Sequence, residues 1–450
     1  MAKKKEIVFK CSECGYSQPK WLGHCPSCGA WSSFEECIVD PNSTSAAFTG
    51  NASTQKIKPI PLNQVLAQEN SRVCTGIFEF DRVLGGGAMK RSAILLGGEP
   101  GIGKSTLMIQ TCAKIQKSTK GKILYVSGEE SAGQVKNRAD RLALNTDGIE
   151  ILCTLRLEDI KDALVALNPV FVVIDSIQTV YSVEAGIVPG TVNQLKFCAN
   201  ELIGWVKERD SILLMSAHVT KDGVIAGPKS LEHMVDTVIS FERNDDEVRF
   251  LRALKNRFGS VDELGIFAMS EKGLEGVKEP SAMFITKREG ETPSGIANTC
   301  VFEGSRAFVV EIQALTVPAK SSMSRVYSDK IDSARVARVA AVLEKRTGLR
   351  FSDQDLYINV AGGIRLSESA IDAALASALH SARTDIPLKD GTVILGELSL
   401  AGEIRPVSRL KLRIKTAREL GFSTILAPEN DDGATKIRSV KEMISQIIAK

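Results

Sequence analysis

A glycine-rich run that ends in a lysine and two hydroxyl residues carries the most specific chemistry in this sequence. The run reads GEPGIGKST, follows the apolar stretch AILLG and precedes a segment with helical spacing. Such a loop can curl so that its backbone N–H groups point at phosphate oxygens, and the positive end of the following helix attracts the same charge. We therefore predict a phosphate-binding loop (P-loop) for ATP. Its candidate nucleotide-binding residues are Gly98, Glu99, Pro100, Gly101, Ile102, Gly103, Lys104, Ser105 and Thr106.

Two residues of this loop and one later carboxylate predict a magnesium nucleotide site. Lys104 would neutralise charge on the β- and γ-phosphates, and Ser105 has the hydroxyl that a P-loop places on Mg²⁺. Asp175 ends the apolar run FVVID. A carboxylate at the end of a buried parallel strand is typical of the Walker B position, which orients Mg²⁺. We expect Ser105 and Asp175 to hold the metal.

Two adjacent acids and a histidine follow other strands of the same region. Glu129 and Glu130 close the run ILYVSG, so either could polarise the attacking water, and the alternative is an acidic pair that starts a helix. His218 ends SILLMSAH, where it could sense the γ-phosphate. The next loop, TKDGVIAGPKS, is rich in glycine and lysine. It is either a nucleic-acid backbone contact or a solvated loop.

The pentapeptide KNRFG adds two cations, Lys255 and Arg257, beside a turn glycine, Gly259. Its composition alone indicates a basic turn. The same residue types suit a phosphate contact or an arginine finger that reaches into the site of a neighbouring subunit. The candidate catalytic residues are Lys104, Glu129, Asp175, Lys255 and Arg257.

Four of the ten cysteines gather near the N-terminus as CSECG and CPSCG. Two Cys-x2-Cys pairs in this spacing favour tetrahedral Zn²⁺, and a rubredoxin-like iron site is the alternative. The expected ligands are Cys11, Cys14, Cys25 and Cys28. Trp21 and Trp31 flank the second pair, where they either stack on bases or pack over the metal.

The composition bounds the class of protein. Hydrophobic residues make up 43% of the 450 residues, charged residues 25%, and the net charge is +3. These values favour two or three globular domains and do not by themselves indicate nucleic-acid binding. The start, MAKKKEIVFKC, lacks the apolar stretch of a signal peptide, and no run approaches the ~20 apolar residues of a membrane span. We expect a cytoplasmic protein without a membrane partner.

The candidate residues need an α/β framework to position them. The runs AILLGG, ILYVSG, FVVIDS and SILLMSAH alternate with helical spacing, which predicts a mainly parallel sheet with helices on both faces. The runs TVISFE, VRFLRALKN and IFAMSEKGL lie too close together for crossovers and predict antiparallel hairpins at one edge. Later, we expect a helix with Asp332 as its N-cap and Gly348 as its terminator. The predicted domains are a C4 zinc finger (1–40), a linker (41–69), an ATPase domain (70–280), a connecting segment (281–330) and an α+β domain (331–450).

The motifs together resemble the RadA (Sms) family of bacterial DNA-repair proteins. The resemblance rests on the cysteine pairs, TGIFEFDRVLGGG, the P-loop, YVSGEES, VIDSIQT, the stretch SAHVTKDGVIAGPKSLEHMVDTV and above all KNRFG. It implies a RecA-like ATPase core, assembly as a homo-hexamer and binding of single-stranded and branched DNA. It also implies branch migration beside the RecA recombinase, and gives Lys255 and Arg257 a functional role.

The resemblance further implies a Lon-protease-like domain at residues 354–450. Lon cleaves peptides with a serine activated by a lysine, and Lys411 stands at the position of that lysine. The serine loop is shortened here to RLSESAID, so that Ser369 or Ala370 takes the serine position. We therefore expect a scaffold or DNA-contacting domain, with a Lon-type serine peptidase as the alternative function. Arg91, before the P-loop, stands where the family more often has a small residue, and we expect little effect from it.

Overall fold

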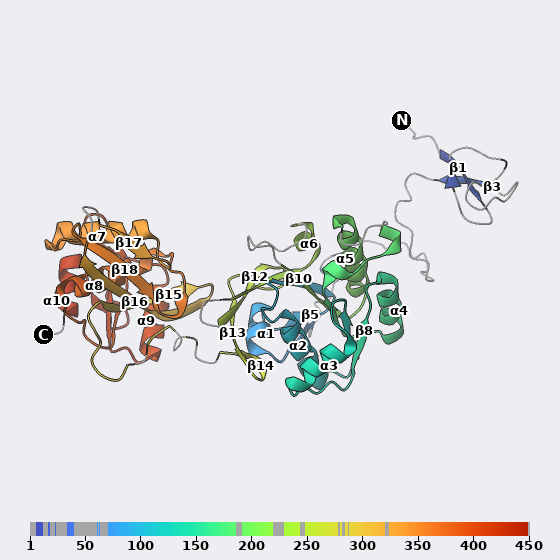
Figure 1. The fold of residues 1–450 in the computed structure, drawn as a ribbon, viewed down its shortest axis with the longest axis horizontal. Helices are drawn as coiled ribbons and strands as arrows, with labels where there is room; N and C mark the ends of the chain where they lie inside the picture. Colours follow the sequence, from blue (N-terminus) through green and yellow to red (C-terminus); the bar gives the residue numbers. More distant parts are fainter. Residues whose placement is uncertain are drawn as a thin grey trace. The chain divides into compact units, whose positions relative to one another are not determined.

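The computed structural model divides the chain into two compact units, Met1–Gln68 and Glu69–Lys450. In the first unit, the residues that the structure describes are those of three strands and the single positions 23, 61 and 63. The strands β1 (Glu6–Cys11), β2 (Ser17–Gln18) and β3 (Phe34–Val39) form an antiparallel sheet in the order β2-β1-β3. The second unit is described over residues 71–448 except 186–190, 219–228, 244–247, 278–279, 281–283, 287 and 320–323 (Figure 1).

The second unit begins with a nine-stranded sheet in the order β14-β13-β12-β11-β6-β10-β9-β7-β8. The six strands from β11 to β8 in this order are parallel, and β12, β13 and β14 extend the sheet with antiparallel pairs. This confirms the predicted parallel sheet with antiparallel hairpins at one edge. The strands are β6 (Ser92–Gly98), β7 (Ile123–Ser127), β8 (Ile149–Cys153), β9 (Phe171–Asp175), β10 (Ile212–His218), β11 (Thr237–Arg243), β12 (Val248–Asn256), β13 (Leu264–Ser270) and β14 (Gly273–Gly276).

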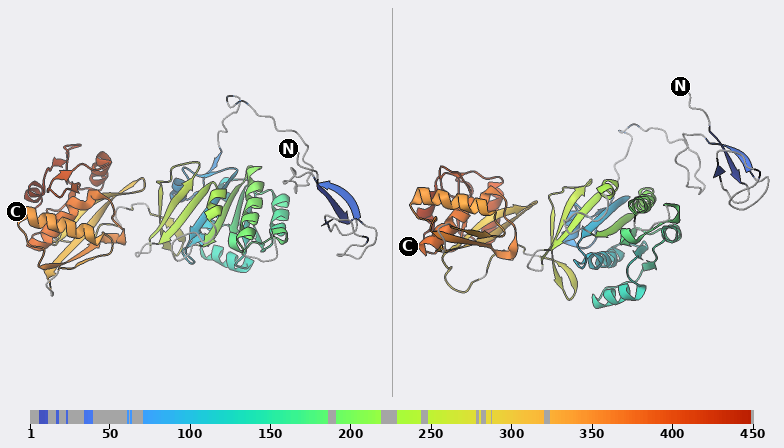
Figure 2. Two further views of the ribbon diagram at one scale, coloured as in Figure 1. Left: turned by 90° about the horizontal axis from the view of Figure 1, so that it is seen from above. Right: turned by 45° about the horizontal axis from the view of Figure 1, so that its top comes forward.

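Helices cover both faces of this sheet (Figure 2). One hydrophobic core lies under α1 (Phe78–Val83), α2 (Lys104–Ser118) and α3 (Ala132–Arg141). The other lies under α4 (Leu157–Leu167) and α5 (Val192–Lys207) and includes Leu231 of the short helix α6 (Lys229–Met234). An antiparallel pair of short strands, β4 (Arg72–Val73) and β5 (Ala88–Met89), precedes β6, and α1 lies between the two in the chain. Every residue of β6 is buried, and its side chains pack into both cores, so the strand that leads into the P-loop is held from both faces.

A seven-stranded mixed sheet forms the rest of the second unit, in the order β17-β18-β16-β15-β19-β22-β23. Its strands are β15 (Ile296–Glu303), β16 (Arg306–Pro318), β17 (Val326–Ser328), β18 (Gln354–Val360), β19 (Thr392–Ile394), β22 (Thr424–Ala427) and β23 (Thr435–Lys436), with a separate pair β20 (Glu397–Leu398) and β21 (Ile404–Arg405). The helices are α7 (Ser333–Thr347), α8 (Asp372–Thr384), α9 (Leu410–Glu419) and α10 (Val440–Ile447).

Residues 281–330, predicted to be a connecting segment, contribute strands to this sheet. The segment contains β15, β16 and β17, and β16 lies near the middle of the sheet with partners on both sides. The reason is that β16 pairs with β18, which follows in the chain only after α7. For α7 the structure agrees with the sequence, because the Asp332 side chain accepts a hydrogen bond from the Arg335 N–H and Gly348 ends the helix with a φ of 80°.

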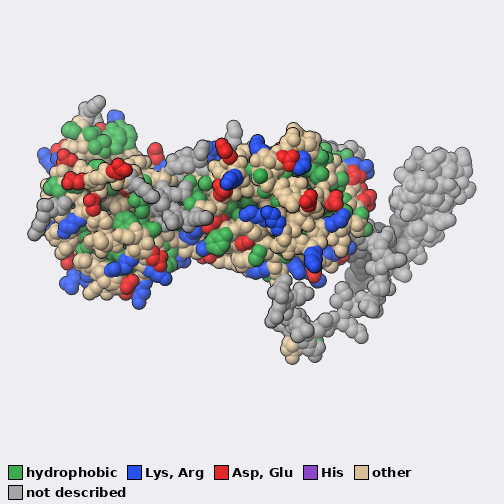
Figure 3. Space-filling view, turned by 90° about the horizontal axis from the view of Figure 1, so that it is seen from below, with side chains coloured by type: hydrophobic (Ala, Val, Ile, Leu, Met, Phe, Trp, Pro, Cys, Tyr) green, Lys and Arg blue, Asp and Glu red, His purple; other side chains and the backbone are tan. Residues whose placement is uncertain are grey.

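The β15–β16 hairpin also packs against the nine-stranded sheet. Arg306 of β16 donates to Glu79 of α1 at 2.6 Å, and Glu303 of β15 pairs with Arg252 of β12. Apolar residues of β12 and β13, such as Phe250 and Ile266, share a core with the C-terminal helices. On the face drawn in Figure 3, acidic and basic side chains are interspersed. None of the described helices is long and apolar enough to cross a membrane.

Candidate nucleotide site

The P-loop follows the central strand of the nine-stranded sheet and leads directly into α2. Gly98 lies between His218 of β10 and Phe241 of β11 in the sheet. A Cβ atom on Gly98 would meet the Phe241 carbonyl oxygen at 2.9 Å, so a larger residue does not fit there. Gly103 has a φ of 117°, in the region that favours glycine, and immediately precedes α2. The loop is therefore shaped by the close approach of its own backbone to the sheet.

Lys104 begins α2 with its ammonium group folded onto the loop. Its Nζ donates to the carbonyl oxygens of Gly98 at 2.7 Å and Glu99 at 3.0 Å, and the residue is 6% exposed. Burial lowers the pKa of Lys104, while the charges of Asp175 and Glu129 act to raise it. Two acids predicted to share the nucleotide site thus act on the lysine at its centre. Ser105 and Thr106 follow, half-buried, in the first turn of the helix.

Asp175 ends β9 with both carboxylate oxygens engaged. Tyr125 of β7 donates its hydroxyl to Oδ2 at 2.8 Å, and Ser216 of β10 donates to Oδ1 at 2.6 Å. Burial raises the pKa of Tyr125 well above its usual value, and the Asp175 charge adds to this, so the phenol stays a donor. The sequence reasoning missed Tyr125 and Ser216. Their signal was a polar residue within each of two otherwise apolar strands that flank β9.

Glu129 and Glu130 are held in different surroundings. Glu129 Oε1 accepts from the Ser176 hydroxyl at 2.6 Å and lies 3.1 Å from His218 Nε2. Ser176 directly follows Asp175, so Glu129 faces the Walker B strand end. Glu130 instead receives two hydrogen bonds from the Arg138 guanidinium on α3, both at 2.5 Å. Arg138 thus holds Glu130 toward α3, whereas Glu129 faces the end of β9.

Lys255 and Arg257 do not lie beside the P-loop. Asn256, between them in the chain, pairs with Thr237 at the start of β11, and Thr237 pairs with Ile94 near the start of β6. The P-loop begins at the other end of β6. Since Ile94 lies four residues before Gly98, the KNRFG turn and the P-loop follow opposite ends of these strands, with ~13 Å of strand between them. Within one chain these predicted catalytic residues are therefore not brought together.

At its own edge, Lys255 binds the end of α6. Its Nζ donates to the carbonyl oxygens of Glu232 at 2.7 Å, His233 at 3.3 Å and Val235 at 2.8 Å. Burial lowers the pKa of Lys255, and the neighbouring Arg257 charge lowers it further. The loop that ends in α6 begins directly after His218, so Lys255 fixes the far end of the segment whose near end contacts Glu129.

Arg257 remains largely free to reach outward. Its side chain is 58% exposed, and Nη1 lies 3.7 Å from Asp236 Oδ1. Asp236 is buried and already accepts from Lys207 Nζ at 2.6 Å on each oxygen and from the Ala93 N–H at 3.0 Å. Arg257 therefore contributes little to neutralising Asp236.

The KNRFG turn also packs against the glycine run before the P-loop strand. A Cβ atom on Gly259 would meet the Gly85 Cα at 3.2 Å, which leaves room only for two glycines. Arg72 binds both segments, since its guanidinium donates to the carbonyl oxygens of Phe258 and of Leu84. The motifs TGIFEFDRVLGGG and KNRFG thus form one packed surface, although they are distant in the sequence.

Several sequence predictions lie outside the described residues. For the four-cysteine unit, only the backbone of Cys11, in β1, is described. Cys14, Cys25 and Cys28 lie outside, as do Trp21 and Trp31. So do most of the linker at 41–69 and residues 219–228, the main part of the predicted nucleic-acid loop.

The C-terminal domain does not assemble the serine–lysine pair of a peptidase. The Lys411 side chain is 84% exposed, and its Nζ lies 3.9 Å from Asp431. Among the described contacts, no hydrogen bond joins Lys411 to Ser369. Beside Ser369, the Glu368 carboxylate instead accepts two hydrogen bonds from the Arg413 guanidinium, at 2.6 and 2.8 Å, and the Arg413 side chain is 1% exposed. An ion pair with a buried arginine therefore adjoins the position where a nucleophile would be activated.

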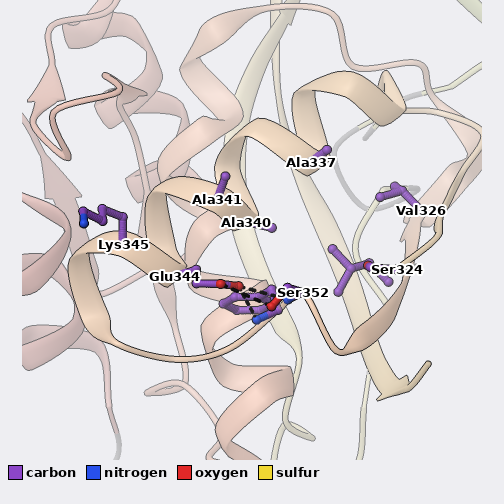
Figure 4. A pocket seen from close by; sticks show the side chains of 10 residues that line it. Ser324, Val326, Ala337, Ala340, Ala341, Glu344, Lys345 and Ser352 are labelled. Atoms are coloured by element: carbon purple, nitrogen blue, oxygen red, sulfur yellow. Dashed lines mark hydrogen bonds between the residues drawn. The ribbon is translucent and has the colours of Figure 1, made fainter. Parts of the chain in front are cut away.

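A hollow of about 680 Å³ lies beside α7 in the same domain (Figure 4). The Glu344 carboxylate at this hollow is taken by the N–H groups of Phe351 at 2.7 Å and Ser352 at 2.9 Å. It is separate from the nucleotide site, because none of its lining residues belongs to the P-loop or its neighbours. The lining residues are Ser324, Val326, Ala337, Ala340, Ala341, Glu344, Lys345, Phe351, Ser352 and Leu356.

Three family models match separate parts of the chain. Residues 9–36 match a rubredoxin metal binding domain, residues 73–161 match the KaiC ATPase and residues 322–431 match subunit ChlI of Mg-chelatase. The first match covers both cysteine pairs, and the second covers the P-loop, Glu129 and Glu130. They agree with a metal-binding unit before a RecA-like ATPase domain and a separate C-terminal domain.

Whole-chain relatives extend these partial matches. A protein of Treponema pallidum is 60% identical over 100% of this chain and 98% of its own. Relatives from Bacillus subtilis (45% identical, 98% and 96% covered) and Listeria monocytogenes (42%, 97% and 95%) match over similar lengths. Each is named DNA repair protein RadA. Since relatives of this name match it over nearly its whole length at 42–60% identity, this chain belongs to the RadA family.

Proposed function

We propose that this chain is an ATP hydrolase that acts in DNA repair. The observation that carries the proposal is the meeting of Lys104, Asp175 and Glu129 at the P-loop end of the sheet. The relatives named for DNA repair supply the cellular role. Lys104 would leave the Gly98 and Glu99 carbonyl oxygens to bind β- and γ-phosphate oxygens, which offer its charge a far stronger partner.

The described residues fit a Mg²⁺ ion bound with the nucleotide. A carboxylate offers about four lone-pair sites, and Tyr125 and Ser216 use two of those on Asp175. Asp175 thus retains acceptors for a water on the metal, while Ser105 contributes a hydroxyl from the first turn of α2. When bound, the ion supplies Lewis-acid polarisation of the phosphate oxygens.

We assign Glu129 as the residue that polarises the attacking water. Its Oε1 is fixed by Ser176 and His218, and among the described residues no lysine or arginine forms an ion pair with it. His218 joins this acid to the loop that follows β10. It is therefore suited to transmit the nucleotide state to that loop, which we expect to contact DNA.

Lys255 and Arg257 would complete the site of a neighbouring subunit. Their place at the opposite end of the strands from the P-loop argues against a role in the same chain's site. A head-to-tail interface between copies would bring one chain's KNRFG turn to the next chain's P-loop, and such an interface forms a ring when the rotation between copies closes. We expect a homo-hexamer in which Arg257 acts as an arginine finger.

The substrate we expect is single-stranded and branched DNA, on which the ring promotes branch migration beside the RecA recombinase. The domain limits 1–40, 41–69, 70–280 and 331–450 remain our proposal, with the C-terminal sheet taken to begin at β15. Cys11, Cys14, Cys25 and Cys28 would hold Zn²⁺, supported by the match of residues 9–36 to a metal binding domain.

ATP turnover with and without single-stranded DNA tests this function. We expect DNA to stimulate hydrolysis, and Lys104→Ala to abolish it in both conditions. Lys114→Ala is the matched control, because Lys114 lies on the same helix and donates only to Gly76 among the described contacts. Turnover that DNA leaves unchanged, together with no DNA binding, would contradict the proposal.

The alternative of a Lon-type peptidase has no supporting contact among the described residues. Lys411 is exposed and paired with Asp431, so its ammonium is not held beside a serine. Release of peptides from an unfolded substrate, abolished by Ser369→Ala or Lys411→Ala, would revive it.

A further inference from the structure

Arg249 is a buried cation that the sequence reasoning did not single out. It is the second residue of β12 and is 7% exposed. Its Nε donates to the carbonyl oxygen of Ile102, in the middle of the P-loop, at 2.8 Å. Burying a guanidinium is unfavourable unless its hydrogen bonds are strong and well placed, and this bond reaches the loop from a strand 147 residues away.

The contact constrains the peptide group that joins Ile102 to Gly103. In a planar trans peptide the carbonyl oxygen and the N–H point in opposite directions. With the Ile102 oxygen held toward Arg249, the Gly103 N–H must point to the opposite side. A P-loop binds phosphate with N–H groups that point inward. The Gly103 N–H can point inward only while the Ile102 carbonyl points outward, and Arg249 holds it there.

The neighbouring strands hold the same peptide from a second direction. A Cβ atom on Gly103 would meet Met269 of β13 at 3.1 Å and Leu274 of β14 at 3.4 Å. Gln110 of α2 binds β14 in both directions, since it accepts from the Leu274 N–H at 3.0 Å and donates to the Leu274 oxygen at 3.3 Å. The antiparallel edge of the sheet therefore supports the loop and α2 together, and Arg249 supplies a directional bond within that support.

We propose that Arg249 is a positioning residue for the nucleotide, which it serves by aiming the Gly103 N–H at phosphate through its bond to the Ile102 oxygen. The inference rests on the proposed ATP site. It assigns a role in that site to β12, the strand whose opposite end carries Lys255. The P-loop and the KNRFG turn of one chain are thereby joined by a single strand that is paired on both sides.

Two substitutions of matched length separate the hydrogen bond from the charge. Glutamine places its amide nitrogen the same number of bonds from Cα as the arginine Nε, so Arg249→Gln keeps a donor for Ile102 and removes the charge. Arg249→Met has the same length and no donor. The probe is a fluorescent ATP analogue, titrated in the full-length protein without DNA, with thermal unfolding measured on each variant.

We expect Arg249→Met to weaken binding of the analogue about tenfold, the loss that corresponds to one hydrogen bond, and Arg249→Gln to stay within about twofold of the unsubstituted protein. Equal binding by all three proteins would overturn the inference and leave the ATP site intact. If Arg249→Met does not fold, the glutamine variant decides, because a folded Arg249→Gln with tenfold weaker binding also overturns it. An unsubstituted protein that binds no ATP analogue would instead overturn the proposed function.

Discussion

Replacing Glu129 by glutamine tests the most specific chemical assignment in this structure. The substitution keeps the shape of the side chain and an oxygen for the Ser176 hydroxyl, which lies 2.6 Å from Oε1. It removes the negative charge that a general base requires. Glu130→Gln is the matched control, because it makes the same change one residue later in the chain.

Glu129→Gln should lower kcat with little effect on stability, whereas Glu130→Gln should lower stability with little effect on kcat. The Glu129 side chain is 43% exposed, so its loss should change the free energy of unfolding by no more than about 1 kcal/mol. Loss of a general base lowers kcat by about 10²- to 10⁴-fold. Glu130 and Arg138 are 31% and 20% exposed and share two bonds of 2.5 Å. Glu130→Gln should therefore destabilise the domain by about 1–2 kcal/mol and leave kcat within a few-fold.

The assay combines kcat for ATP hydrolysis in the presence of single-stranded DNA with the thermal unfolding midpoint of each variant. A destabilisation of about 1 kcal/mol lowers the midpoint by about 2–4 °C in a domain of this size. The assignment is refuted if Glu130→Gln lowers kcat a hundredfold while Glu129→Gln leaves it unchanged. A large fall in both midpoints would also refute the separation of roles.

Three further predictions concern stability. Arg91 has a φ of 59° and only an exposed pair with Asp210, so Arg91→Gly should raise the unfolding free energy by about 1 kcal/mol, with Asp210→Asn as the control in thermal unfolding. Burial acts to raise the pKa of Glu311, but bonds from Arg288 and Gln313 outweigh it and hold the pKa below 4.5. The stabilisation from the Arg288–Glu311 ion pair should be complete above pH 4.5 and lost in more acid solution. Arg288→Met removes the pair and should lower the free energy of unfolding by about 3 kcal/mol, measured by urea unfolding at pH 7. Zinc chelation should unfold residues 11–28 and leave the core's calorimetric transition unchanged, because residues 1–68 form a separate unit.

The P-loop end of the site followed closely from the sequence. Alternating apolar and helical runs determine a parallel sheet, and parallel strands deliver their carboxyl ends to one edge. This predicts Asp175 and Glu129 at the same edge as Lys104, and in the structure the charges of both acids act on that lysine. The choice between Glu129 and Glu130 could not be made from the sequence. It depends on Arg138, one helix away, which binds only the second acid.

The position of Lys255 and Arg257 was equally inaccessible. Both follow an apolar strand run, as Asp175 does, but β12 is antiparallel to β11, so its end lies at the opposite edge of the sheet. Strand direction at a sheet edge depends on partners and not on local pattern. For the same reason, the sequence did not predict β15 and β16 within residues 281–330. The strand β16 pairs with β18, and helix α7 lies between these two strands in the chain.

Mixing two inactive variants tests whether the ATP site is completed between subunits. Lys104→Ala chains lack the P-loop cation, and Arg257→Ala chains lack the finger. In co-expressed mixed rings, an intact P-loop of an Arg257→Ala chain can face the intact Arg257 of a Lys104→Ala neighbour. At equal amounts and random order, about a quarter of the sites should recover ATP hydrolysis. Mixed rings with no more activity than either variant alone would contradict a site shared between subunits.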